Sequence, residues 1–150
     1  MATPTSTPLL YRRILMVVDL NDDIARLGAR ARSIASACGA ELKLLHVVEY
    51  VPVEPMGETL LPAIEVEEEL IKRARARLEE LGAGLGLEPS ACRVEAGNTK
   101  SEIVRVAAES GSDLVVIGSR ERHGLSILVN LTEDSVLHAA HCDVLAVRLK

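Results

Sequence analysis

Short apolar runs of strand length alternate along this chain with longer amphipathic segments of helix length. Four such runs span residues 13–20, 41–48, 113–118 and 143–149, and a shorter one spans 92–96. Continuous apolar runs are typical of strands buried on both faces. Strands separated by helices require a parallel sheet, because each helix returns the chain to the same edge and covers a face. We therefore predict an α/β fold, with a single open five-stranded parallel sheet that is doubly wound, Rossmann-like and covered by helices on both faces.

The segments between the runs carry helical signals. Apolar residues recur at three-and-four spacing over 22–38, and Gly39 follows at the C-cap position. A long amphipathic helix is predicted over 63–81, closed by the glycines of 82–86, after a Pro-containing loop over 50–62. Thr99-Lys-Ser-Glu102 has the spacing of a capping box and opens a third helix, and a fourth helix ends near His138. Asn98 and Thr99 are interpreted as helix caps.

Composition excludes several classes of protein. Aromatic residues make up 1% of the chain and the formal net charge is −5, so neither a stacking platform nor a basic surface for nucleic acid is expected. No apolar stretch approaches the roughly 20 residues of a membrane span, and residues 1–8 carry no secretory signal pattern. We expect a flexible tail over 1–10, one domain over 11–150 and a cytoplasmic location. The three cysteines lack a C-x-x-C spacing and are expected to be reduced thiols.

Five motifs follow one another at the spacing of a known family. They are Ile14-Leu-Met-Val-Val-Asp19, Leu44-Leu-His-Val-Val48, Asp113-Leu-Val-Val-Ile-Gly-Ser119, His123-Gly-Leu-Ser126 and His141-Cys-Asp-Val-Leu-Ala-Val-Arg148. Over residues 11–149 the chain resembles the universal stress protein family. The resemblance implies a parallel sheet of strand order 3-2-1-4-5, a homodimer and a small protein induced under stress.

Many members of that family bind ATP through a Gly-x-x-Gly motif followed nine residues later by Gly-Ser or Gly-Thr. Gly118 fills the first position here, but Glu121 and Leu131 replace the next two glycines, and Thr132 alone matches the final pair. A carboxylate repels polyphosphate, and a branched side chain blocks the close backbone approach that glycine permits. Glu133 places a further anion where a helix N-terminus would receive phosphate. We therefore predict that ATP binds poorly and that no cofactor is needed.

Several positions of the family's nucleotide site nevertheless match. Asp19 corresponds to the acid that contacts the base or ribose of the nucleotide. The alternative hypothesis is therefore a site that binds ATP or AMP. Besides Asp19, its residues are Val17, Val47, Ile117, Gly118, Ser119, Gly124 and Thr132. Each has a structural alternative: Asp19 satisfies backbone donors at a turn, Gly118 permits a sharp strand exit, and Thr132 is an N-cap.

Other chemistry receives no support from the sequence. His138, His141 and Cys142 are too few for a zinc site, and His46 is interpreted as a core histidine. Neither a Gly-x-Ser-x-Gly elbow nor a Walker motif is present, so we predict no catalytic residues and no metal.

The leading hypothesis is a non-enzymatic stress-response or regulatory protein that acts as a dimer through protein contacts, with a protein partner that the sequence does not identify. The final strand is predicted to be a sheet edge, whose exposed backbone groups are satisfied by pairing with a second copy. Val144, Ala146 and Arg148 are the predicted dimer contacts. Neither nucleic acid nor a membrane is an expected partner.

Overall fold

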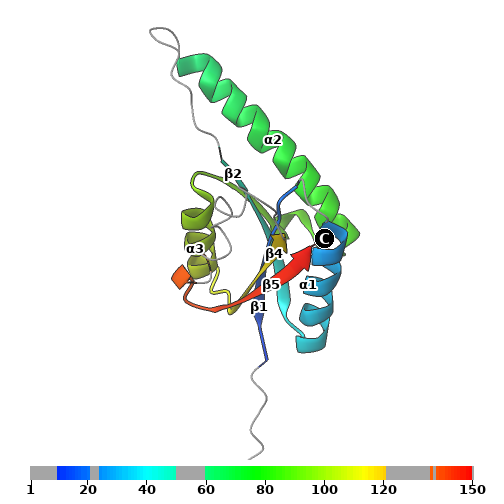
Figure 1. The fold of residues 1–150 in the computed structure, drawn as a ribbon. Helices are drawn as coiled ribbons and strands as arrows, with labels where there is room; N and C mark the ends of the chain where they lie inside the picture. Colours follow the sequence, from blue (N-terminus) through cyan, green and yellow to red (C-terminus); the bar gives the residue numbers. More distant parts are fainter. Residues whose placement is uncertain (1–9, 21–23, 50–59, 121–135, 137, 150) are drawn as a thin grey trace, which may run out of the picture.

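The described part of the molecule is built on one parallel sheet (Figure 1). The computed structural model describes residues 10–20, 24–49, 60–120, 136 and 138–149. The strands are β1 (Arg13–Val17), β2 (Glu41–Val48), β3 (Cys92–Ala96), β4 (Leu114–Arg120) and β5 (Asp143–Leu149). Their order in the sheet is β3-β2-β1-β4-β5 and all neighbouring pairs are parallel. The predicted α/β class and the strand order are confirmed.

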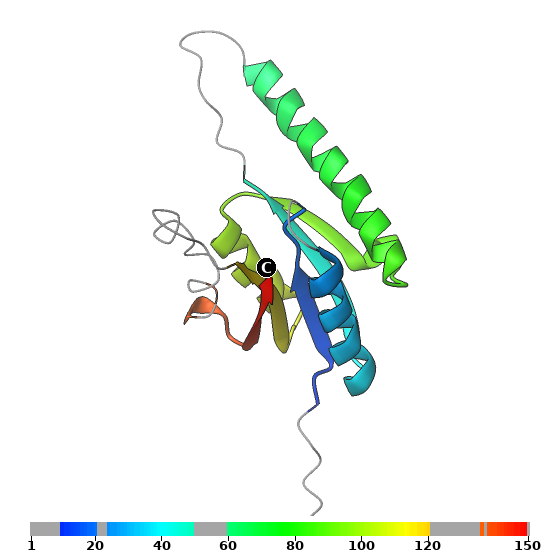
Figure 2. The ribbon, with the colours of Figure 1, turned by 45° about the vertical axis from the view of Figure 1, so that its right-hand side comes forward.

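Helices cover both faces of this sheet. They are α1 (Ile24–Cys38), α2 (Leu60–Gly84) and α3 (Thr99–Glu109), with a short 3₁₀ helix η1 (Pro89–Ala91) before β3. In Figures 1 and 2, α1 and α2 lie on one side of the sheet and α3 lies on the other. The predicted fourth helix falls mainly outside the described residues, although Ala140 N–H donates to the carbonyl of Val136 at 2.9 Å.

Alternate residues of each strand enter two separate hydrophobic cores, as expected of side chains that point to opposite faces of a strand. Met16, Leu44 and Val116 lie in the core under α1 and α2, while Leu15 and Val115 lie in the core under α3. These five side chains are at most 1% exposed. The sheet is therefore buried on both sides, which is why its strands lack polar alternation in the sequence.

Helix α2 is longer at both ends than the predicted range 63–81. Its first turn includes Pro62, which a helix tolerates there because the first N–H groups have no acceptor within the helix. The helix ends at Gly84, within the predicted glycine segment 82–86, although Gly82 itself still lies in the helix. A β-carbon at Gly82 would lie 2.6 Å from Sγ of Cys92, so this glycine allows helix and strand to approach closely, and the turn comes at Gly86, whose φ is +76°.

Candidate functional site

Three apolar side chains from neighbouring strands meet near the carboxyl edge of the sheet. Val17 pairs in register with Ile117 on β4 and with Leu45 on β2, two residues before Val47. Val17, Val47 and Ile117 belong to the core under α3 and are 8%, 8% and 6% exposed. In doubly wound sheets ligands bind beyond the carboxyl ends of the strands. The structure therefore brings together the three predicted apolar site residues.

Asp19 lies exposed just beyond the end of β1. Val18 lies between the last residue of β1 and Asp19, and its N–H donates to the carbonyl of Leu45 at 2.8 Å. The hydrogen bonding of β1 with β2 therefore extends to the residue before Asp19. The same turn is fixed from β2, because Nδ1–H of His46 donates to the carbonyl of Val18 at 2.7 Å. His46 is thus hydrogen-bonded, as predicted, but it is half-buried and not part of the core.

Gly118 is explained by packing between β4 and β5. The interpretation that it ends the strand is wrong, because β4 continues to Arg120 and Gly118 pairs with Val147. A β-carbon at this position would lie 2.5 Å from Cδ1 and 3.4 Å from Cγ of Leu149. Leu149 is 1% exposed, so the space that a side chain would need is already filled.

The N-terminus of α3 opens at the same edge and is satisfied by the protein's own groups. Asn98 is the N-cap and its Oδ1 accepts from Ser101 N–H at 3.0 Å, so the predicted capping role of Asn98 is confirmed. Thr99 is instead the first helical residue, and its N–H donates to Oε1 of Glu49 at 3.1 Å. Hydrogen bonds to the carboxylate from the side chain of Thr99 and from its backbone N–H lower the pKa of Glu49.

Glu49 is a residue that the sequence predictions missed. It directly follows β2, and Asn98 follows β3, the neighbouring strand. Polar residues that follow adjacent parallel strands meet at one edge, so this spacing is a signal from which the contact could have been found. The consequence is that a carboxylate occupies a helix N-terminus which otherwise suits an anionic ligand.

The remaining candidate positions divide between described and undescribed residues. Ser119 is half-buried in β4 and pairs in register with Arg148. The predicted ligand residues Gly124 and Thr132 and the motif-breaking residues Glu121, Leu131 and Glu133 lie outside the described residues.

Strand β5 is an edge of the sheet. Val144 packs on the core under α3, while Ala146 and Arg148 are exposed.

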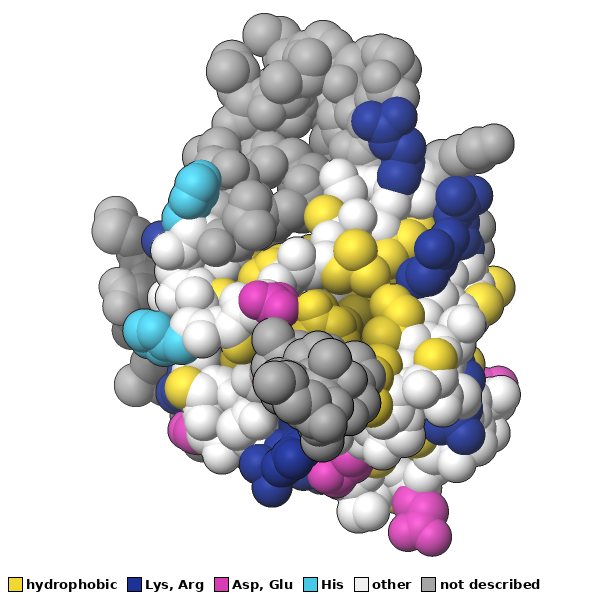
Figure 3. Space-filling model, turned by 90° about the horizontal axis from the view of Figure 1, so that it is seen from below, with side chains coloured by type: hydrophobic (Ala, Val, Ile, Leu, Met, Phe, Trp, Pro, Cys, Tyr) yellow, Lys and Arg dark blue, Asp and Glu magenta, His cyan; other side chains and the backbone are white. Residues whose placement is uncertain are grey.

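Hydrophobic side chains gather in a hollow in the middle of the face of the molecule seen from below (Figure 3). Exposed apolar surface of this kind is typical of contact surfaces.

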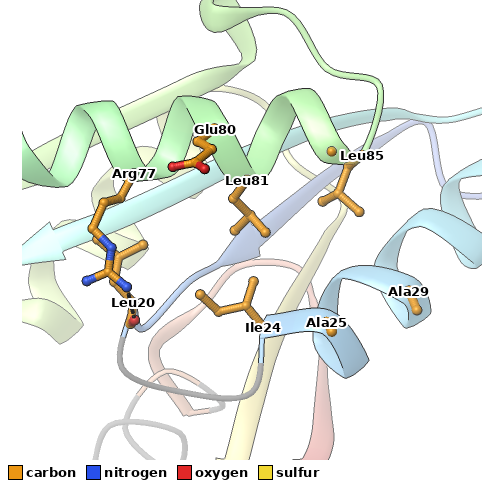
Figure 4. Close-up of a pocket in the computed structure, with 9 residues that line it drawn as sticks. Leu20, Ile24, Ala25, Ala29, Arg77, Glu80, Leu81 and Leu85 are labelled. Atoms are coloured by element: carbon orange, nitrogen blue, oxygen red, sulfur yellow. Dashed lines mark hydrogen bonds between the residues drawn. The ribbon is translucent and has the colours of Figure 1, made fainter.

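A groove of about 560 Å³ lies between α1 and α2, on the face of the sheet opposite to α3 (Figure 4). Ile24 from α1, Leu81 from α2 and Leu85 from the turn that follows α2 supply apolar walls. Arg77 lies at one end, where its Nη2–H donates to the carbonyl of Leu20 at 3.0 Å. None of the predicted site residues lines this groove.

Within the described ranges, no group of three His, Cys, Asp or Glu side chains has an arrangement that could hold a metal ion. The three cysteines are all free, and burial raises the pKa of the Cys92 and Cys142 thiols. No described helix has the length and hydropathy needed to cross a membrane.

The fold defines a doubly wound α/β protein whose candidate site lies beyond the carboxyl ends of parallel strands. The family model described as the universal stress protein family matches residues 10–148. Universal stress protein A homolog 2 of Coxiella burnetii is 33% identical over 141 residues, which cover 93% of this chain and 97% of that protein. The chain therefore belongs to the universal stress protein family.

Solved structures share the fold. A functionally unknown protein from Pseudomonas aeruginosa superimposes with a TM-score of 0.69 at 24% identity, over 98% of this chain and 50% of that chain. The chain thus spans about half the length of that protein. A universal stress protein in complex with cAMP superimposes with a TM-score of 0.57 at 25% identity, over 92% of this chain and 97% of that one.

Proposed function

We propose that this universal stress protein is a non-enzymatic stress-response or regulatory protein that works in the cytoplasm as a homodimer, through protein contacts and without tight binding of ATP. The observation that carries the proposal is the combination of Glu121 and Leu131 at two glycine positions of the phosphate motif. A triphosphate needs close backbone approach and positive potential, and these two residues remove both.

The described structure supports the proposal at two further points. Gly118 matches the motif, but its lack of a side chain is required by Leu149. The N-terminus of α3, at the same edge, is hydrogen-bonded by Glu49 and Asn98. A retained glycine and a nearby helix N-terminus are therefore both accounted for without a phosphate ligand.

A second candidate is a switch that responds to a nucleotide with little or no phosphate tail, or to AMP or ATP as the family pattern suggests. It is favoured by the position of Val17, Val47 and Ile117 near the carboxyl edge of the sheet, with Asp19 two residues beyond the end of β1. A relative that is 25% identical was solved with cAMP. An apolar floor of this kind accommodates a base without any contact to polyphosphate.

Isothermal titration calorimetry separates the two candidates. We expect ATP·Mg to show no saturable binding to the wild-type chain at concentrations up to about 1 mM, which corresponds to a binding free energy weaker than about −4 kcal/mol. A matched variant, Glu121→Gly with Leu131→Gly, restores the glycine pattern and is expected to gain affinity for ATP. Micromolar binding of ATP by the wild-type chain would overturn the proposal, and saturable binding of AMP or cAMP alone would favour the second candidate.

A further inference from the structure

Helix α2 carries most of its charges in two separate blocks, and Glu79 and Glu80 follow the second block near the end of the helix. The acidic block lies in its first half and the basic block in its second half. The members are Glu65, Glu67, Glu68 and Glu69 in the acidic block, and Lys72, Arg73, Arg75 and Arg77 in the basic block. Seven of the eight are exposed, and Glu67 is half-buried. A helix with this pattern has acidic and basic surfaces on either side of its residues 70 and 71.

The acidic half of α2 stands away from the sheet. In both ribbon views this half extends beyond the other described elements, while the second half lies near α1 and the sheet (Figures 1 and 2). Val66 and Leu70 are 48% and 38% exposed there. With Arg73 and Arg77 they form a stripe at intervals of four, three and four residues, the spacing of contact positions between paired helices. The long stems of the arginines extend the apolar part of this stripe.

The two blocks are only partly neutralised within the chain. Nε–H of Arg73 donates to Oε1 of Glu69 at 3.1 Å, four residues earlier. Arg77 donates to the carbonyl of Leu20. Among the residues that the structure describes, the other members of the two blocks make no ion pair within 4.0 Å. Most of this segregated charge is therefore available to a partner.

We propose that α2 is a self-association surface that binds α2 of a second copy of this chain in antiparallel orientation. The blocks lie at nearly equal distances on either side of residues 70 and 71, so a two-fold axis there places each acidic block against the basic block of the partner. In a two-fold dimer both copies use the same surface, so each contact between two residues occurs twice. The contact is made by the charged face of α2, and Val66 and Leu70 lie at its flank, because at 3.6 residues per turn they are rotated well away from Glu65, Glu68 and Lys72. A parallel pair would oppose like charges and is disfavoured.

The contact is separate from the dimer proposed through β5. A 25-residue helix is about 37 Å long, and one face of it buries less than the roughly 800 Å² per partner of a typical stable interface. Association through α2 alone is therefore weak. When two chains are already paired through β5, the α2 contact links one such dimer to another. Exposed charges are screened at about 10 Å in 0.1 M salt, so the α2 contact weakens as salt rises.

Charge exchange tests the proposal. One variant reverses the acidic block (Glu65→Lys, Glu68→Lys, Glu69→Lys) and the other reverses the basic block (Lys72→Glu, Arg73→Glu, Arg75→Glu). Half-buried Glu67 and hydrogen-bonded Arg77 are left unchanged. Both variants carry Ala146→Arg, which removes the proposed β5 contact, and circular dichroism confirms that each is folded. Sedimentation velocity at low salt measures the self-association of each variant and of an equal mixture, beside the Ala146→Arg chain alone.

We expect the Ala146→Arg chain to associate at low salt, each reversed variant to associate at least about tenfold more weakly, and the mixture to recover the association. Recovery in the mixture excludes misfolding as the reason for the loss. The proposal is overturned if the Ala146→Arg chain stays monomeric at every concentration, if the reversed variants associate as it does, or if the mixture of folded variants fails to recover. Association that is unchanged by raised salt also overturns it.

Discussion

A β-carbon at Gly118 would collide with Leu149, a residue that lies 31 positions further along the chain and in the neighbouring strand. The grouping of Val17, Val47 and Ile117 near one edge of the sheet could be predicted from the sequence, because each lies near the end of a recognisable buried strand. The role of Gly118 could not be predicted, because the contact that requires it exists only once β5 pairs with β4. Family patterns and packing demands thus coincide at one residue for different physical reasons.

The packing role of Gly118 predicts coupling between the two positions. Gly118→Ala is expected to lower the free energy of unfolding by about 1–3 kcal/mol, the usual cost of overfilling a core. Leu149→Ala removes a buried side chain and costs about 2–5 kcal/mol. In the double variant the new methyl group occupies part of the vacated space, so the combined loss is smaller than the sum. Urea denaturation of the wild-type chain, the two single variants and the double variant measures these free energies. Losses of the free energy of unfolding that are strictly additive would contradict the packing explanation.

At the scale of single elements, helix ends differ most from the sequence predictions. The capping-box spacing at Thr99 gave the correct helix, but the cap is one residue earlier at Asn98, and Glu102 is paired with Arg105. Glu95 and Glu109 join the same ion-pair network through Arg93 and Arg105. Such contacts link a strand to a helix, so local spacing alone does not reveal them. Periodicity predicts the existence of a helix better than its ends.

The contact of Glu49 with the first turn of α3 predicts a pH-dependent contribution to stability. Its pKa is lower in the folded chain than the ordinary value of about 4.3. The stabilisation is therefore complete above that ordinary value and is lost as pH falls through the folded pKa. Because Glu49 is exposed, we expect Glu49→Gln to cost less than about 1 kcal/mol at pH 7.

Chemical denaturation at neutral and strongly acidic pH measures this difference between the wild-type chain and Glu49→Gln, which should shrink as pH falls. The matched control is Glu88→Gln, because Glu88 precedes η1 without a side-chain cap hydrogen bond. A difference for Glu49→Gln that persists unchanged in acid would argue against the carboxylate as its cause.

At the scale of the whole molecule, the alternation of apolar runs and helices led to the correct class, and the family resemblance to the correct strand order. Both rest on patterns repeated along the chain, so errors at single boundaries do not affect them. The assembly is a different matter, because a contact between copies leaves only indirect marks in one sequence. The exposed edge strand β5 and the segregated charges of α2 are such marks.

The proposed dimer contact through β5 is tested by placing a charged side chain on this edge strand. Ala146 is exposed on this strand, so Ala146→Arg should fold normally while it places like charges against each other in the proposed dimer. We expect the molar mass from light scattering to fall from that of a dimer to that of a monomer at high salt, where the α2 contact is weakened. Ala37→Arg adds the same charge at an exposed position of α1 and should leave the dimer intact. A dimer that tolerates Ala146→Arg places the contact elsewhere.

The central claim is that the phosphate end of the family's nucleotide site no longer accepts a triphosphate. The most direct measurement is a crystal structure grown with excess ATP and Mg²⁺. We predict no ordered triphosphate beside residues 118–132. Clear density for three phosphates hydrogen-bonded to the backbone of these residues would contradict the claim.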